Sequence, residues 1–111
     1  MTWTVKVRAG SKVQRAKHEQ RENALAEIEE RGRELERSAT GRPVKSPFRE
    51  YEPVQQVIGR IELSGPGRVR AGLDVRGDAS TECWTGRLSR KVVEQRGGET
   101  AYDALRRVTA G

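Results

Sequence analysis

The clearest pattern in the chain is an alternation of apolar and polar positions in its second half. Small or apolar side chains occupy every second position of 57–63 and of 69–75, and charged side chains lie between many of them. Successive side chains of a strand point to opposite sides of a sheet, so this period of two predicts two half-buried strands. The segment 64–67 has a proline between glycines, which predicts a turn. A hairpin with this turn pairs Leu63 with Val69 and puts both apolar sets on one face.

A third alternating segment, 81–88, follows a second turn signal at Gly77-Asp78. A loop of two residues and a loop of four residues, each starting at this glycine, would place the same side chains of 81–88 on the apolar face. The sequence does not decide between the two lengths. In either case Trp84 and Leu88 join the apolar face and Cys83 joins the polar face. We therefore expect an antiparallel meander with one apolar side, which the helices must cover.

The N-terminal part of the chain predicts a strand and a long helix. Residues 3–8 alternate between apolar and polar side chains, which indicates a strand with one buried face. From residue 20 to residue 39, apolar residues recur at three- and four-residue steps, which is typical of one helix face. The intervening segment, 12–18, fits either a returning strand or the exposed start of the helix. The turn signal at 9–11 favours the strand.

Three further segments complete the expected fold. Three prolines within 43–53 exclude a central strand or a helix interior, and they favour an extended crossover or an edge strand. Residues 90–98 are expected to form a polar connector. Thr100 and Asp103 have the spacing of a capping box, and the apolar stripe around them predicts a short helix. The expected fold class is α+β: an antiparallel sheet of four to five strands with two helices packed on one face, in the order β-β-α-β-β-β-α.

Length and composition narrow the class of protein. The chain has 111 residues, which fits a single small domain, 1–111. Its hydrophobic content is only 33%, but the apolar residues are periodic, which argues against disorder. One cysteine excludes an internal disulfide, and no apolar segment reaches membrane length. We therefore expect a cytoplasmic protein that does not associate with membranes.

Charge is the feature that bears most directly on function. The formal net charge is +6 and the sequence pI is about 10.1. Residues 1–18 hold five basic side chains and no acid, whereas residues 19–39 hold seven glutamates and four arginines. Phosphate groups bind closely spaced lysines and arginines on a fitting surface. The candidate polyanion-binding residues are Lys6, Arg8, Lys12, Arg15 and Lys17 in the N-terminal segment and Arg60, Arg70, Arg76 and Arg87 on the polar face of the meander.

The chain contains no motif that indicates catalysis, a cofactor or a metal. His18 is its only histidine, which excludes a His-His metal pair and most catalytic triads. Asp74, Asp78 and Glu82 step by four residues, but the first and last are expected on opposite faces and do not converge on a cation. The neighbours of Cys83 do not favour a thiolate. We therefore expect a protein that is not an enzyme and that has no cofactor or bound metal.

Two functions fit these expectations. The first is a small basic protein that binds DNA, RNA or another polyanion with weak sequence preference, because the longest expected helix is net acidic and would be repelled by phosphates. The alternative is a homo-oligomeric protein–protein assembly or adaptor module without a nucleic-acid role. In that case the acidic helix would face a basic surface on the partner.

Overall fold

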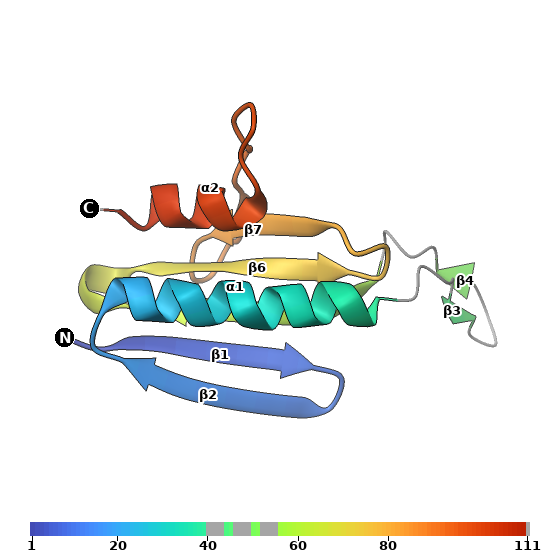
Figure 1. Cartoon of the computed structure of the whole chain (residues 1–111), viewed down its shortest axis with the longest axis horizontal. Coiled ribbons are helices and arrows are strands. Elements are labelled where there is room, and N and C mark those ends of the chain that lie inside the picture. The colour runs from blue at the N-terminus through green and yellow to red at the C-terminus, as the bar shows by residue number, and fades with distance from the viewer. Residues whose placement is uncertain (40–43, 46–49, 52–55, 111) are drawn as a thin grey trace.

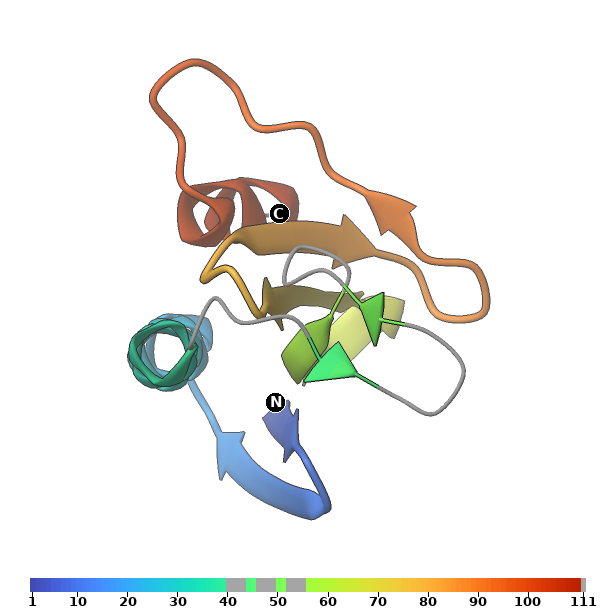
Figure 2. The same cartoon turned by 90° about the vertical axis from the view of Figure 1, so that its right-hand side faces the viewer.

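The computed structural model describes residues 1–39, 44–45, 50–51 and 56–110, and it has the α+β class that the sequence pattern predicts. The elements of the main body are β1 (Trp3–Ala9), β2 (Lys12–His18), α1 (Arg21–Ser38), β5 (Val57–Ser64), β6 (Arg70–Arg76), β7 (Thr81–Thr85), β8 (Lys91–Val92) and α2 (Ala101–Val108). The strands form one antiparallel sheet in the order β2-β1-β5-β6-β7-β8. Both helices lie on the same side of this sheet (Figures 1 and 2). We call the opposite side the open face.

The sheet has six strands, one more than the upper limit expected from the sequence. The additional strand is β8, which forms inside the expected polar connector and pairs with β7. Both of its residues are exposed, so no apolar alternation marks it in the sequence. Within the expected crossover, β3 (Val44–Lys45) pairs with β4 (Glu50–Tyr51) rather than with the main sheet. The remaining positions of that crossover, including Phe48 and its prolines, lie outside the described residues.

The ambiguous segment 12–18 is a strand. Ala9 pairs with Lys12 across a two-residue loop, and the first loop residue, Gly10, has a φ of 61°. Ser11 has no positive φ, and a positive φ at the first loop position alone is the pattern of a type II′ turn, in which glycine is favoured there. The turn signal in the sequence therefore located this hairpin correctly, and β2 becomes an edge strand of the sheet.

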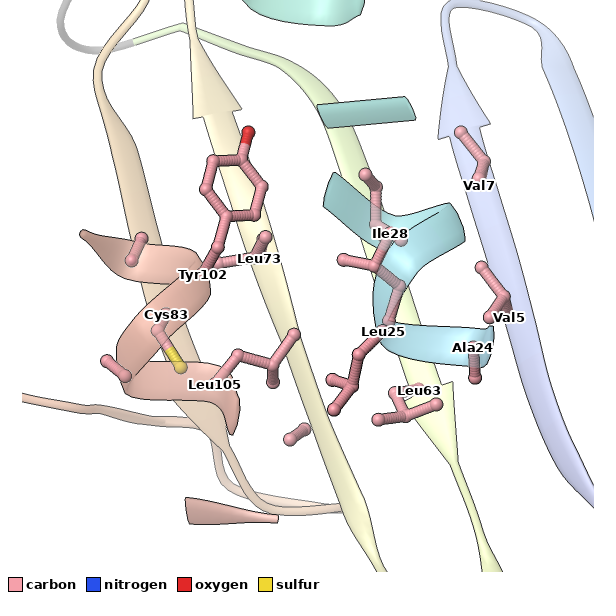
Figure 3. Close-up of a cluster of buried hydrophobic side chains, with 14 residues drawn as sticks. Val5, Val7, Ala24, Leu25, Ile28, Leu63, Leu73, Cys83, Tyr102 and Leu105 are labelled. Atoms are coloured by element: carbon pink, nitrogen blue, oxygen red, sulfur yellow. The ribbon is translucent and has the colours of Figure 1, made fainter. Parts of the chain in front are cut away.

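The hydrophobic core lies between the two helices and the inner face of the sheet (Figure 3). Its buried side chains come from four strands and both helices, and they include Val5, Val7, Leu25, Ile28, Ile61, Leu63, Leu73, Cys83, Tyr102 and Leu105. The apolar positions expected in the middle of β5 and β6 are thus confirmed. Two expected positions at the ends of strands differ: Val57 is 41% exposed and Leu88 is 98% exposed.

The hairpin between β5 and β6 has a register two residues away from the expected one. Leu63 pairs with Ala71 instead of Val69. The reason is a longer loop, in which the amide of Gly65 donates to the carbonyl of Val69 and a 3₁₀ turn, Pro66–Arg68, lies between them. A shift by two residues leaves every side chain on its original face, so the apolar face is unchanged.

The hairpin between β6 and β7 has a facing that the sequence did not predict. The amide of Arg76 donates to the carbonyl of Ser80 at 2.9 Å, which leaves a three-residue loop, 77–79. The expected loops had an even number of residues, and the odd number reverses the facing of β7. Ala79 has a φ of 69°, the left-handed conformation that closes a three-residue loop. The expectation for this strand was therefore wrong: Cys83 faces the core and Trp84 faces the open side.

Replacing Cys83 by serine is expected to destabilise the fold by about 1–3 kcal/mol, because it would bury a hydroxyl in the hydrophobic core. The Cys83 side chain is fully buried, and this burial raises the pKa of its thiol to about 12. Urea unfolding measures the change, and Cys83→Ala is the matched control because it introduces no polar group. We also expect alkylation of the thiol near neutral pH to be slow in the folded protein and fast in urea. Equal stability of wild type and Cys83→Ser would contradict the inward facing.

The two helices contact each other through a glycine. A Cβ atom added to Gly32 of α1 would lie 2.3 Å from the hydroxyl oxygen of Tyr102 in α2. The glycine therefore leaves room for the tyrosine ring. The Tyr102 hydroxyl donates to Glu36 at 2.5 Å, and the Arg33 guanidinium lies 4.5 Å from the ring centroid. These contacts fix α2 beside α1 above the core.

The start of α2 has the expected capping box. The amide of Asp103 donates to the Thr100 hydroxyl at 3.1 Å, and the amide of Thr100 donates to the Asp103 carboxylate at 3.0 Å. Just before the helix, Glu99 accepts two hydrogen bonds from Arg107, at 2.8 and 3.0 Å. These bonds lower the pKa of the Glu99 carboxyl to about 2.

Candidate polyanion-binding surface

The open face carries the side chains that alternate with the core residues. Strand pairing arranges them in rows, of which the two central ones run Arg15–Lys6–Glu62–Gly72–Trp84–Val92 and Val13–Arg8–Arg60–Asp74–Glu82. Each row begins on β2 and crosses the sheet. The β2–β1 end of the rows carries only basic charge, and acidic residues begin at β5. The open face therefore has two halves with different electrostatics.

Four basic side chains form the first half, which we call the basic half-face: Lys6 and Arg8 of β1 and Arg15 and Lys17 of β2. The last three are exposed, and Lys6 is partly buried. None of the four has a hydrogen bond or an ion pair with another described residue. Lys6 faces Glu62 across the β1–β5 pairing, but the Glu62 carboxylate is bound by Arg90 at 3.3 Å.

The arginines of the second half are bound by carboxylates. Arg60 donates two hydrogen bonds to Asp74, at 2.7 and 3.0 Å, and Arg76 donates to Glu82 at 3.1 Å. Asp74 and Glu82 lie opposite each other on the same face, contrary to the expectation that they face apart. Since each carboxylate is held by an arginine, they do not form a cation site. Asp78 accepts from the amide of Ser80 in the loop at 2.9 Å.

Trp84 covers the centre of the second half. Its indole lies against Gly72, because a Cβ atom added there would be 2.4 Å from the Trp84 ring. The indole Nε1 donates to Asp74 at 3.1 Å, and the Arg90 guanidinium lies 4.7 Å from the ring centroid. Trp84 is only 5% exposed as a result. The ring is thus part of a packed polar network and is not available for stacking on a base.

The other candidate residues lie away from the basic half-face. Arg70 and Arg87 are exposed and line a shallow cavity of about 50 Å³ beside Trp84, together with Arg90 and Glu62. Lys12 lies on the helix side of β2, where it lines a groove against α1. Of the nine candidates, the structure therefore gathers four on the basic half-face and two at this cavity. Arg60 and Arg76 are in ion pairs, and Lys12 is on the other side of the sheet.

The described part of the chain offers little other chemistry. Among the described residues, no group of three or more His, Cys, Asp or Glu side chains is placed to hold a metal ion. His18 contacts Glu27 of α1 through its Nε2 atom. None of the described helices is long and apolar enough to cross a membrane. Comparisons with protein-family models, with curated proteins and with solved structures found no match.

Proposed function

We propose that the protein binds the phosphate backbone of nucleic acid through the basic half-face, with Arg70 and Arg87 as additional contacts. The observation that carries the proposal is the set of four cationic side chains on two adjacent strands that have no partner among the described residues. They span three successive rows of the sheet, about 14 Å along the strands. Phosphates that bind there release their counterions, and no protein ion pair has to be broken first.

The same surface favours phosphate contacts over base contacts. Proteins that read single strands stack bases on exposed aromatic side chains. Trp84 is an aromatic side chain in one of the two central rows of the open face. Arg90 and Asp74 enclose its indole. The acidic helix α1 lies on the other side of the sheet (Figure 2). We therefore propose binding with weak sequence preference and without catalysis.

The experiment is a salt titration of binding to a random-sequence DNA duplex, followed by fluorescence anisotropy. Four contacts from the basic half-face, or six with Arg70 and Arg87, predict a slope of about −3.6 to −5.4 in a plot of log affinity against log salt concentration. The affinity should then fall about 150- to 1,800-fold between about 50 and about 200 mM salt. The triple variant Arg8→Glu, Arg15→Glu, Lys17→Glu should abolish binding at the lower salt concentration.

A control variant of the same net charge distinguishes the effect of the basic half-face from the effect of the total charge. Arg37, Lys91 and Arg96 are exposed and lie outside the basic half-face. Replacing these three by glutamate changes the formal charge from +6 to 0, since 6 − 3 × 2 = 0, as the first triple variant also does. The control variant should keep most of its affinity. If wild type does not bind the duplex at the lower salt concentration, or if both variants lose binding equally, the proposal is wrong.

A further inference from the structure

The strand β2 presents a free edge. It is the terminal strand in the sheet order, and it is seven residues long. Figure 1 shows it at the boundary of the molecule, with no described strand or helix beyond it. Unpaired backbone groups along an exposed edge are a template for an additional strand. At the opposite edge, β8 has only two residues and offers much less of such a template.

The charges of β2 act against pairing with a second copy of the same strand. Complete antiparallel overlap would place Arg15 opposite Arg15. Like charges directly opposite each other destabilise a strand pair. Basic side chains on an edge strand are a known means of preventing such self-association. A strand that adds to β2 therefore has to bring acidic side chains.

A groove runs between β2 and α1 on the helix side of the sheet. Two cavities of about 360 and 220 Å³ share Val7, Gln14 and Arg31 in their walls, so they form one continuous depression. Val5 and Ala16 also line it, next to the charged side chains of α1. Side chains of a strand added at β2 would alternate between this groove side and the open face.

Arg31 is the cation that α1 contributes to this groove, whose walls also contain Lys12, Glu27 and Glu34. Its spacing from Glu27 would allow an ion pair within α1, but Glu27 contacts His18 instead. Arg31 lines both cavities, is partly buried and has no hydrogen bond or ion pair with a described residue. The groove therefore contains a half-buried guanidinium that is free to bind a carboxylate from a ligand.

We infer that β2 is the docking site of an extended acidic segment of a partner protein, which adds to the sheet as a seventh strand. Acidic side chains on one side of that segment meet Arg31 and Lys12. Main-chain pairing along the edge supplies affinity, and the alternating carboxylates supply specificity. This site goes beyond nucleic-acid binding, because it depends on the edge and on the groove rather than on the open face.

The test uses a fluorescent, end-capped peptide of alternating glutamate and valine, eight residues long, which favours an extended conformation. The peptide should bind wild type. Arg31→Ala should weaken binding about tenfold or more, the effect of losing one charge-assisted hydrogen bond. Because Arg31 has no partner among the described residues, the melting temperature of this variant should stay close to that of wild type.

A second variant tests the edge itself. Ala9 and Lys12 close a two-residue hairpin loop, and hydrogen-bonded pairs alternate along an antiparallel ladder, so the amide of Val13 is expected to point away from β1. Val13→Pro removes that outward donor and leaves the ladder with β1 in place. It should abolish peptide binding, whereas the control Val13→Thr, which keeps the amide, should bind like wild type.

Three results would overturn the inference: no binding of the peptide to wild type, equal binding by Val13→Pro and wild type, or equal binding of a peptide of the same sequence whose backbone nitrogens are all methylated. The last peptide has no backbone N–H to donate to a strand, so it detects binding by charge alone. Neither variant alters the basic half-face. Loss of peptide binding with duplex binding retained, or the reverse, therefore distinguishes this inference from the proposed function.

Discussion

Leu73→Ala is expected to destabilise the protein by about 2–5 kcal/mol, the range for emptying a core site of a leucine side chain. Leu73 is fully buried in the middle of β6, between Ile61 of β5 and Cys83 of β7. Figure 3 shows it beneath Tyr102 of α2, in the same cluster as the side chains of α1. Because strands on both sides and helices above hold its surroundings in place, the cavity would collapse only in part. Urea unfolding followed by circular dichroism measures the loss.

Leu88→Ala is the matched control for this experiment. It removes the same atoms from a leucine that is 98% exposed, after the end of β7. Its effect should be within about 0.5 kcal/mol of zero. If the two substitutions cost the same, the assignment of Leu73 to the core and of Leu88 to the surface is contradicted.

Asp74→Ala is expected to cost about 2–3 kcal/mol, because it leaves a buried donor without an acceptor and also breaks an ion pair. Asp74 is 5% exposed and accepts hydrogen bonds from Arg60 and from the indole of Trp84. The Arg60 side chain is 30% exposed, so water can replace part of what it loses, and this keeps the expected cost below that of a fully buried pair. Urea unfolding followed by tryptophan fluorescence measures the effect.

Asp74→Asn separates the two contributions. The amide oxygen of asparagine can still accept from the Trp84 indole, but the charge that pairs with Arg60 is lost. We expect this variant to cost about 1 kcal/mol. If Asp74→Ala and Asp74→Asn are equally unstable, the hydrogen bond from Trp84 contributes no measurable stability and the described network is wrong in that part.

The type of each main element could be predicted from the sequence because its period is set by local geometry. The alternation in 57–63 and the three- and four-residue steps in 21–38 are properties of the chain itself. The facing of β7 depends instead on whether the preceding loop has an odd or an even number of residues. That number follows from the left-handed conformation of Ala79, which is not a glycine and therefore gave no signal. One residue of loop length exchanged the sides of Cys83 and Trp84.

For a related reason, the sequence alone could not show which basic residues are free and which are paired with a carboxylate. The expected register of β5 and β6 places Arg60 opposite Gly72 and Glu62 opposite Arg70. The observed register is shifted by two residues, so Arg60 lies opposite Asp74 and Glu62 lies opposite Gly72. The shift keeps the arginines on the open face but changes which of them has a carboxylate partner. The ion pair of Arg60 with Asp74 is thus a result of tertiary structure, not of composition.

The position of the Trp84 indole on Gly72 has a consequence for how the sheet opens. The strands β5, β6 and β7 are covered on both sides, by the helices on one and by the indole network on the other. The hairpin of β1 and β2 has cover only on the helix side, and most of β2 is exposed. Segments with few buried contacts open at the lowest free energy. We therefore expect local unfolding to begin at β2. A ligand that binds this hairpin would cover its open side and raise the protection of its backbone amides against hydrogen exchange.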